Sequence, residues 1–199
     1  MYNIMKVQKR NGDMEDVSFD KILKRIQLLC NGEEFTKKLT IDPTIIAQKV
    51  CSEIYDGVTT TTLDELSYQI AISLYSTNLD YSILASRIVV SNHHKNTEGN
   101  FAKKVSMLYN AITNERSTPL VNSEFYELVN SNQEEIQSVI DYKRDYDFDF
   151  FGLKTLEKSY LYKVKNIYVY KSYIKIVKVF FLKIYKSLKA IKNVIAFFF

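Results

Sequence analysis

Two short segments that mix apolar and polar residues open the chain, and a turn motif separates them. Residues 4–9 (IMKVQK) and 14–19 (MEDVSF) flank the sequence RNGD at residues 10–13. Asn-Gly is the strongest short hairpin signal, because both residues tolerate positive φ angles. The pattern therefore predicts a β-hairpin over residues 4–19.

After the hairpin, apolar residues recur at the spacing of an α-helix. Ile22, Ile26 and Leu29 share one helical face. Asp20 can cap this helix by accepting a hydrogen bond from its first turn, and Asn-Gly at residues 31–32 ends it. The cations on the other faces are expected to point toward solvent; they are Lys21, Lys24 and Arg25.

Three more helices are predicted from capping signals followed by apolar stripes. Asp42 is a cap residue and Pro43 suits the first helical position, so a helix begins there and continues to the break at residues 56–57. Residues 62–65 (TLDE) fit a capping box, in which the Thr hydroxyl and the Glu carboxylate satisfy backbone donors. The helices are expected over residues 43–55, 62–76 and 80–95, with a further helical stretch from residue 100 toward residue 110.

Beyond Pro119 the apolar spacing is helical again at residues 125–129 and 136–140. The acidic and aromatic string that follows, DYDFDFFGLKTLEKSYL at residues 145–161, predicts an extended segment. Neither an internal repeat nor a Gly/Ser linker separates these parts, so a second helical layer is expected to pack directly on the first. The predicted fold class is α+β and mostly α, with a small N-terminal hairpin sheet on a four-helix bundle.

Charge and composition change near residue 164. Residues 1–163 carry all 23 acidic and 19 of the 27 basic residues, whereas residues 164–199 carry eight Lys and no acid, which accounts for the net charge of +4. The second part lacks Gly and Pro and is rich in residues that AT-rich codons specify, which favours translated non-coding sequence. The alternative is a basic amphipathic helix on a membrane surface, with its cations at Lys183, Lys186, Lys189 and Lys192.

Composition disfavours several classes of protein. Cys30 and Cys51 are too few for a four-Cys metal site or a disulfide framework, and they indicate a reducing, cytoplasmic environment. The first residues lack an apolar signal region and no stretch of about 18 residues is free of charge, which disfavours secretion and membrane insertion. Adjacent His93 and His94 would point about 100° apart on a helix, so no metal site is expected there. The excess basic charge lies in the last residues and does not indicate nucleic-acid binding.

The best candidate for binding chemistry is the segment KRNGDMEDVSFDKI at residues 9–22. Lys9 and Arg10 lie at the end of a tight hairpin whose second strand leads into a helix N-terminus, and this combination favours an anion. Glu15 and Asp16 can accept hydrogen bonds from a ribose hydroxyl or an adenine amine. A nucleoside triphosphate fits this arrangement, and a solvated hairpin tip explains the same residues equally well. The sequence contains neither a Walker loop nor GxGxxG, so ATP hydrolysis is not supported.

Three segments, in order, carry a family resemblance: KRNGDMEDVSFDKI, IYDGVTTTTLDELSYQIA and DYSILASRIVVSNHHKNT. Together they resemble the ATP cone at the N-terminus of class I ribonucleotide reductase large subunits. The segments PLVNSEFYELV and IDYKRDYDFDFFGLKTLEKSYLYK look like the helices that lead into the catalytic barrel of that enzyme. The resemblance implies an ATP-cone domain at residues 1–96, a helical N-terminal segment of the large subunit at 97–163 and a tail outside the family at 164–199.

This resemblance also implies a ligand. ATP and dATP, with Mg²⁺, would bind the cone as allosteric effectors of ribonucleotide reduction for DNA synthesis. Lys9 and Arg10 would contact phosphates, Lys95 would close on them, and Thr60 and Asp64 would approach the nucleoside. The residues that would wrap the base and ribose are Glu15, Asp16, Val17, Ser18, Phe19, Asp20 and Lys21.

The resemblance stops before the catalytic part of the family. The family is a thiol-dependent oxidoreductase, but its barrel cysteines have no counterpart here, so the chain alone is predicted to be inactive, with no catalytic residue and no metal site. The implied partners are the rest of the large subunit, the small subunit and further copies in a homo-oligomer. The alternative is a stand-alone ATP-cone module that acts at a membrane through its basic tail or as a repressor, although a repressor would need a four-Cys zinc ribbon.

Overall fold

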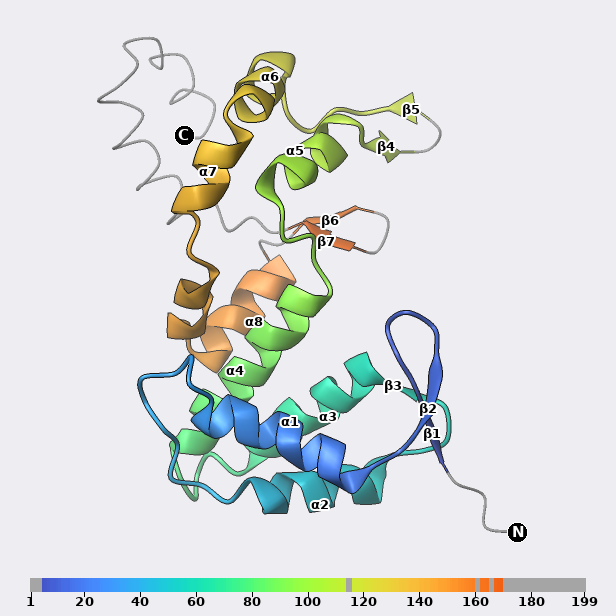
Figure 1. Cartoon of the computed structure of the whole chain (residues 1–199), viewed down its shortest axis with the longest axis vertical. Helices are drawn as coiled ribbons and strands as arrows, with labels where there is room; N and C mark the ends of the chain where they lie inside the picture. Colours follow the sequence, from blue (N-terminus) through green and yellow to red (C-terminus); the bar gives the residue numbers. More distant parts are fainter. Residues whose placement is uncertain (1–4, 114–115, 160–161, 165–166, 170–199) are drawn as a thin grey trace. The chain divides into compact units, whose positions relative to one another are not determined.

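The computed structural model describes residues 5–113, 116–159, 162–164 and 167–169, and the chain forms two compact units. The first unit combines the residues up to Asn96 with Tyr142–Ser159, and the second is built around Thr97–Asp141 (Figure 1). The predicted division at residues 96 and 163 concerns family boundaries and stays a prediction. The compact units group the chain differently, because residues 142–159 return to the first unit.

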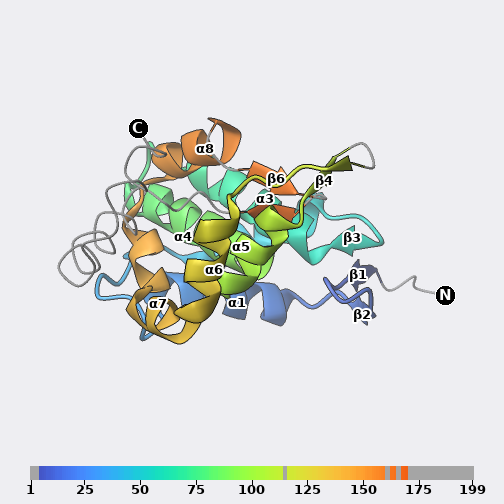
Figure 2. The same cartoon turned by 90° about the horizontal axis from the view of Figure 1, so that it is seen from above.

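A three-stranded sheet lies at one end of the first unit (Figures 1 and 2). Strands β1 (Lys6–Gln8) and β2 (Met14–Asp16) pair antiparallel, which confirms the predicted hairpin. Gly12 in the turn has φ of +92°, a conformation that favours glycine. The third strand, β3 (Val58–Thr59), pairs parallel with β1 and was not predicted, because two residues are too short to show an alternating pattern.

Four helices follow in the first unit, as predicted: α1 (Phe19–Asn31), α2 (Pro43–Glu53), α3 (Thr60–Ser73) and α4 (Asp80–Lys95). The Asp42 side chain caps α2, as predicted, by accepting a hydrogen bond of 2.8 Å from the backbone N–H of Thr44. The predicted cap of α1 is wrong, since Ser18 rather than Asp20 accepts the hydrogen bond, here from Lys21.

The predicted start of α3 is also wrong. Thr59 is the cap residue, and its hydroxyl oxygen accepts a hydrogen bond of 3.1 Å from the backbone N–H of Thr62. Thr59 is also the last residue of β3, so the helix begins directly where the strand ends. Four consecutive threonines at residues 59–62 offered four equivalent hydroxyls, and the pairing of β3 with β1 selects the first of them.

The core of the first unit lies around α4. Leu84, Ile88 and Val90 are almost fully buried there, against apolar residues of α1, α2 and α3. Apolar neighbours contact α4 on more than one side, so most of its residues are buried. This burial is expected for a central helix. Its last residue, Lys95, reaches the end of the unit that carries the hairpin.

Residues 142–159 form a 3₁₀ helix, η1 (Tyr142–Asp147), and α8 (Phe150–Ser159), so the predicted extended segment is wrong. The Asp149 carboxylate accepts a hydrogen bond of 2.6 Å from the backbone N–H of Gly152 in the first turn of α8. Phe150 and Leu153, three residues apart on one helical face, are buried in the core of the first unit. Burial of this face stabilises a helix where the alternation of acids and aromatics suggested a strand.

The second unit contains α5 (Phe101–Tyr109), α6 (Ser123–Ser131) and α7 (Gln133–Val139), which confirms the helices predicted on both sides of Pro119. Its small core is formed by Ala102, Val105, Val129 and Ile136. Two hairpins complete the described residues: β4 (Ile112–Thr113) with β5 (Arg116–Ser117), and β6 (Tyr162–Val164) with β7 (Ile167–Val169).

The alternative interpretation of the tail, a membrane-surface helix with Lys183 to Lys192, concerns residues outside those that the structure describes. Among the residues that are described, no helix combines the length and the apolar character needed to cross a membrane.

Candidate functional site

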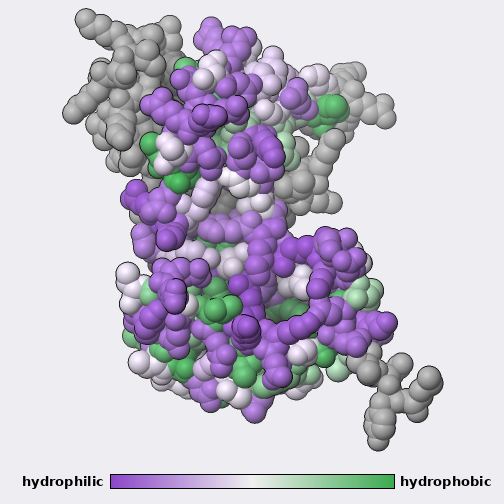
Figure 3. Space-filling model, viewed as in Figure 1, coloured by the Kyte–Doolittle hydropathy of each residue, from purple (hydrophilic) through white to green (hydrophobic). Residues whose placement is uncertain are grey.

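A cavity of about 240 Å³ lies in the first unit between the hairpin, α1, α3 and the end of α4. Charged side chains surround a recess with an apolar floor (Figure 3). The cations that line it are Lys9, Arg10, Lys21, Arg25 and Lys95, and the acids are Glu15, Asp16 and Asp64. Five cations against three acids make this a pocket that attracts anions.

The hairpin and the regular spacing of residues along the helices place these side chains around the same cavity. Lys9 and Arg10 directly follow β1, at the tip of the hairpin. On α1, Lys21 and Arg25 are four residues apart and therefore share a face. Thr60, Leu63, Asp64 and Ser67 have the spacing of one face of α3, and that face also lines the cavity.

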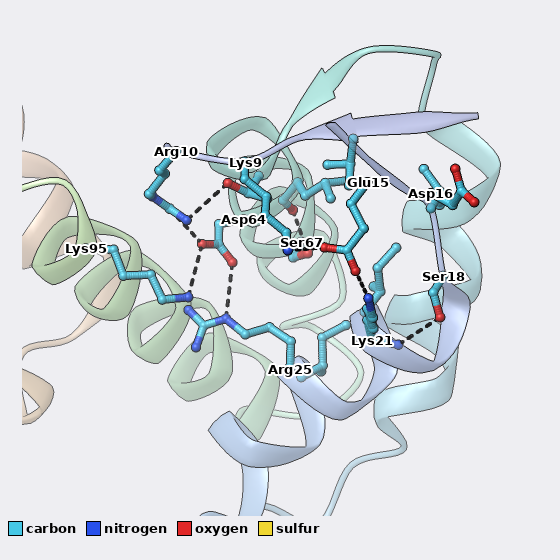
Figure 4. A pocket seen from close by; sticks show the side chains of 16 residues that line it. Lys9, Arg10, Glu15, Asp16, Ser18, Lys21, Arg25, Asp64, Ser67 and Lys95 are labelled. Carbon is cyan, nitrogen blue, oxygen red and sulfur yellow. Dashed lines mark hydrogen bonds and ion pairs between the residues drawn. The ribbon is translucent and has the colours of Figure 1, made fainter. Parts of the chain in front are cut away.

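Asp64 is the centre of the charged cluster. Its carboxylate is 9% exposed and lies 3.2 Å from the Arg10 guanidinium, 3.4 Å from Nε of Arg25 and 3.9 Å from Nζ of Lys95. Figure 4 shows these three cations converging on Asp64 from the hairpin, α1 and α4. One carboxylate therefore neutralises only part of the positive charge that meets at this point.

Arg10 joins the hairpin to the helices through most of its donors. Its Nε donates to Asn96 Oδ1 at 2.8 Å, Nη2 donates to Asn92 Oδ1 at 2.6 Å, and Nη1 donates to Thr60 Oγ1 at 3.3 Å. A guanidinium held at three nitrogens is fixed in direction, which suits it to a site that must recognise an anion with defined geometry.

Glu15 lies on the other side of the pocket, between two lysines. The Glu15 carboxylate forms ion pairs with both Lys9 and Lys21 (Figure 4). The Glu15 side chain is 23% exposed, whereas the two lysine side chains are about half exposed or more. Both lysines are therefore accessible to a ligand while Glu15 holds them at the mouth of the pocket.

Lys95 shows the electrostatic character of the site. The pKa of Lys95 is lowered from 10.5 to about 8, chiefly by burial and also by the positive charges of Arg25 and Arg10, while the carboxylate of Asp64 opposes these effects. An anion that binds beside such a lysine stabilises its charged form, and this stabilisation favours binding.

Comparison with known protein families identifies the region of the chain that contains this pocket. Residues 5–96 match the family described as the ATP cone domain. These residues are an ATP cone. The predicted resemblance is thereby confirmed for the part of the chain that contributes every residue lining the pocket.

Relatives extend the match beyond the ATP cone. The ribonucleoside-diphosphate reductase large subunit of Dictyostelium discoideum is 46% identical over 164 residues, which are 81% of this chain and 19% of that protein. The corresponding subunit of vaccinia virus (strain Copenhagen) is 45% identical over 164 residues, 81% of this chain and 21% of that protein. That of Arabidopsis thaliana is 42% identical over 168 residues, 83% of this chain and 20% of that protein.

The chain thus spans about a fifth of the length of these curated relatives. Its match is to a part of ribonucleoside-diphosphate reductase large subunits.

Ten of the twelve site residues that were predicted from the sequence line the pocket of the ATP cone. Phe19 and Asp20 do not line it, because they lie in the first turn of α1 and successive residues of a helix point about 100° apart. The prediction that Arg25 points toward solvent is wrong, since it lines the pocket and contacts Asp64. Its spacing of four residues from Lys21 was the signal that could have placed it there.

The cysteines lie apart from the cone pocket. Burial raises the pKa of the Cys30 thiol to about 11, and burial also raises the pKa of Cys51. A thiol with a raised pKa stays protonated at neutral pH and is a poor nucleophile. In the part of the chain that the structure describes, no group of three or more His, Cys, Asp or Glu residues could hold a metal ion.

Proposed function

We propose that the ATP cone of this chain binds ATP and dATP as regulatory effectors. The observation that carries the proposal is that Lys9, Arg10 and Lys95, which come from distant parts of the sequence, line one pocket. Their charges suit a triphosphate, and the apolar floor formed by residues such as Val7 and Leu63 suits a base. No hydrolysis is proposed, because the sequence contains neither a Walker loop nor GxGxxG.

Each side of the pocket then has a role. Phosphates are held by Lys9, Arg10 and Lys95, with Arg25 added because it contacts the same carboxylate, Asp64. Asp64 and Thr60 approach the nucleoside, where their oxygens can accept hydrogen bonds from sugar hydroxyls. The remaining base and ribose contacts come from Glu15, Asp16, Val17, Ser18 and Lys21. Mg²⁺ would accompany the triphosphate and neutralise part of its charge.

For the whole protein, we propose a ribonucleoside-diphosphate reductase whose large subunit is regulated by this cone. On this proposal residues 97–163 continue the large subunit and residues 164–199 lie outside the family. The chain works in the cytoplasm with the rest of the large subunit, further copies of it and a small subunit, and it has no reductase activity alone. A stand-alone module is less well supported, because the similarity to the large subunits covers 81% of the chain and not the cone alone.

Isothermal titration calorimetry tests the proposed function. We expect the chain to bind ATP and dATP with dissociation constants well below about 1 mM, which corresponds to a binding free energy beyond roughly −4 kcal/mol. Incubation with a reductase small subunit, a thiol reductant and a ribonucleoside diphosphate should give no deoxyribonucleotide. Failure to bind either nucleotide would refute the regulatory role. Formation of deoxyribonucleotide would refute the prediction that the chain has no reductase activity alone.

Binding of ATP is expected to take up a proton near pH 8.5. Lys95 has a pKa of about 8 in the protein alone, so it has lost much of its charge at that pH. A bound triphosphate favours the charged form and raises this pKa, because opposite charges stabilise each other. Affinity is therefore greatest below pH 8 and falls as pH rises through 8, by at most about tenfold for each pH unit. Calorimetry in buffers with different ionisation enthalpies measures the proton uptake.

Lys95→Arg is the control for this pH effect. Arginine keeps its charge throughout this range, so the variant should bind ATP without proton uptake and with an affinity that no longer falls between pH 8 and 9. The phosphate groups of ATP titrate near pH 6, so they do not contribute above pH 8. Proton uptake that persists in Lys95→Arg would show that another group is responsible.

A further inference from the structure

Two of the three acids that line the cone pocket form ion pairs with all five of its cations. Glu15 pairs with Lys9 and Lys21. Asp64 pairs with the other three cations, which are Arg10, Arg25 and Lys95 (Figure 4). The cations that are proposed to hold phosphate are therefore already paired with carboxylates of the protein, and a phosphate must compete with these carboxylates.

The two carboxylates differ in what it costs to lose their cations. Glu15 is partly exposed and its two lysines are about half exposed or more, so water can replace the ion pairs. The Asp64 side chain is buried, and a buried carboxylate that loses its partners is left as an uncompensated charge. Competition with an incoming phosphate is therefore strongest at Asp64.

Arg10 shows how direct this competition is. Four of its five N–H groups donate to acceptors of the chain, which are Asp64, Asn92, Asn96 and Thr60. A phosphate that binds a guanidinium through two parallel hydrogen bonds must displace at least one of these acceptors. Asp64, at 3.2 Å from Nη2, is the charged one among the four. Because like charges repel, a phosphate displaces Asp64 in preference to the neutral acceptors.

A displaced Asp64 carboxylate needs new hydrogen-bond donors, because an ionised carboxylate can only accept. The oxygens of an ionised polyphosphate are also acceptors, so an inorganic polyphosphate gives Asp64 no partner. The sugar of a nucleotide carries hydroxyl groups that can donate. A nucleoside triphosphate can therefore replace part of what Asp64 loses, whereas inorganic tripolyphosphate cannot.

We propose that Asp64 is a specificity-determining residue, which competes with phosphate for its three cations and thereby favours nucleoside triphosphates over inorganic polyphosphates. A pocket with five cations and no such competitor would attract polyanions of any kind. This inference rests on the proposed function, since the cations are taken to hold the triphosphate.

Asp64→Asn tests the proposal, because it removes the negative charge and keeps the shape of the side chain. We expect the variant to bind inorganic tripolyphosphate about tenfold more tightly, the lower end of the effect that one charge has on another within 4–6 Å. Calorimetry measures this affinity. Unchanged or weaker binding of tripolyphosphate, or no detectable binding by either chain, would overturn the proposal.

ATP is the second ligand for the same variant. An amide oxygen accepts a weaker hydrogen bond from a sugar hydroxyl than a carboxylate does, so part of the gain at the phosphates is lost at the nucleoside. The ratio of ATP affinity to tripolyphosphate affinity should therefore fall by about threefold to tenfold. An unchanged ratio would mean that Asp64 does not discriminate between these ligands.

Glu65→Gln is the matched control. Glu65 is the next residue of α3, it is exposed, and it does not line the pocket. The substitution removes the same charge as Asp64→Asn, so tripolyphosphate affinity should stay within about twofold of that of the unaltered chain. A gain equal to that of Asp64→Asn would show that net charge determines the affinity, and it would overturn the proposal.

The unaltered chain provides a measurement that does not depend on the folding of a variant. In a carbon-13 NMR titration with tripolyphosphate, the carboxyl signal of Asp64 should shift as its cations turn to the phosphate. The carboxyl signal of Asp56, which is exposed and does not line the pocket, should not shift. A constant Asp64 signal while backbone amides of the pocket respond would show that the carboxylate is not displaced, against the proposal.

The two ligands also separate this inference from the proposed function. If the unaltered chain does not bind ATP, the proposed function fails, whatever the result with tripolyphosphate. If ATP binds and tripolyphosphate affinity is not raised in Asp64→Asn, the proposed function stands and the selective role of Asp64 is refuted.

Discussion

The double variant Lys9→Ala, Arg10→Ala is expected to bind ATP about 3–6 kcal/mol more weakly than the unaltered chain, because each charge-assisted hydrogen bond contributes roughly 1.5–3 kcal/mol. Both cations follow β1 at the tip of the hairpin and line the pocket. A loss of this size is about a hundredfold to ten-thousandfold in dissociation constant. Calorimetry with ATP should then detect little or no binding.

The control for this variant must change the net charge equally. Lys24 and Lys49 are exposed residues of α1 and α2, and neither lines the pocket. Lys24→Ala, Lys49→Ala should therefore bind ATP within about threefold of the unaltered chain, since only long-range attraction is reduced. Circular dichroism must show that both double variants are folded, because Arg10 also contacts Asn92 and Asn96. Equal loss in both variants would mean that net charge, and not the pocket, controls binding.

Signals between neighbouring residues were enough to predict most elements of the first unit. The hairpin depends on a turn in which Gly12 adopts a positive φ, and the start of α2 depends on Asp42 and Pro43. In each case the physical cause lies within a few residues of the element that it determines, so the sequence pattern contains it.

The position of Arg25 depends on partners that are distant in sequence. Asp64 is 39 residues away and Ser91 is 66 residues away, on two other helices. The apolar stripe of α1 indicates which face is buried, but a face beside that stripe can meet either solvent or another helix. Only the packing of α3 and α4 against α1 decides that Arg25 lies in a pocket.

The misreading of residues 145–161 has a similar cause. Acids and aromatics alternate from Asp145 to Phe150, which is the period of a strand. The helix α8 forms because Phe150 and Leu153 enter the core of the first unit, and that core is built from residues 50 or more positions earlier. Tertiary burial thus outweighs the local pattern.

Phe150→Ala is expected to destabilise the first unit by about 3–5 kcal/mol, the usual cost of removing a buried phenylalanine from a core. Phe150 is 8% exposed, and its ring lies 5.7 Å from that of Tyr68 on α3. Because the chain has two compact units, the loss should be measured locally, by amide hydrogen exchange in α4, rather than from one global transition. Amides of α4 should exchange at a free energy lower by that amount.

The neighbouring Phe151 provides the control, since it is 62% exposed and contacts the Phe150 ring only from the surface, edge to face at 5.5 Å. Phe151→Ala should lower the exchange free energy of α4 by less than about 1 kcal/mol. If Phe150→Ala were equally mild, α8 would contribute little to the core, and residues 142–159 could be removed without affecting the ATP cone. A large effect of Phe150→Ala on α4 means that the cone folds as one cooperative unit with a segment that follows it by almost 50 residues in the sequence.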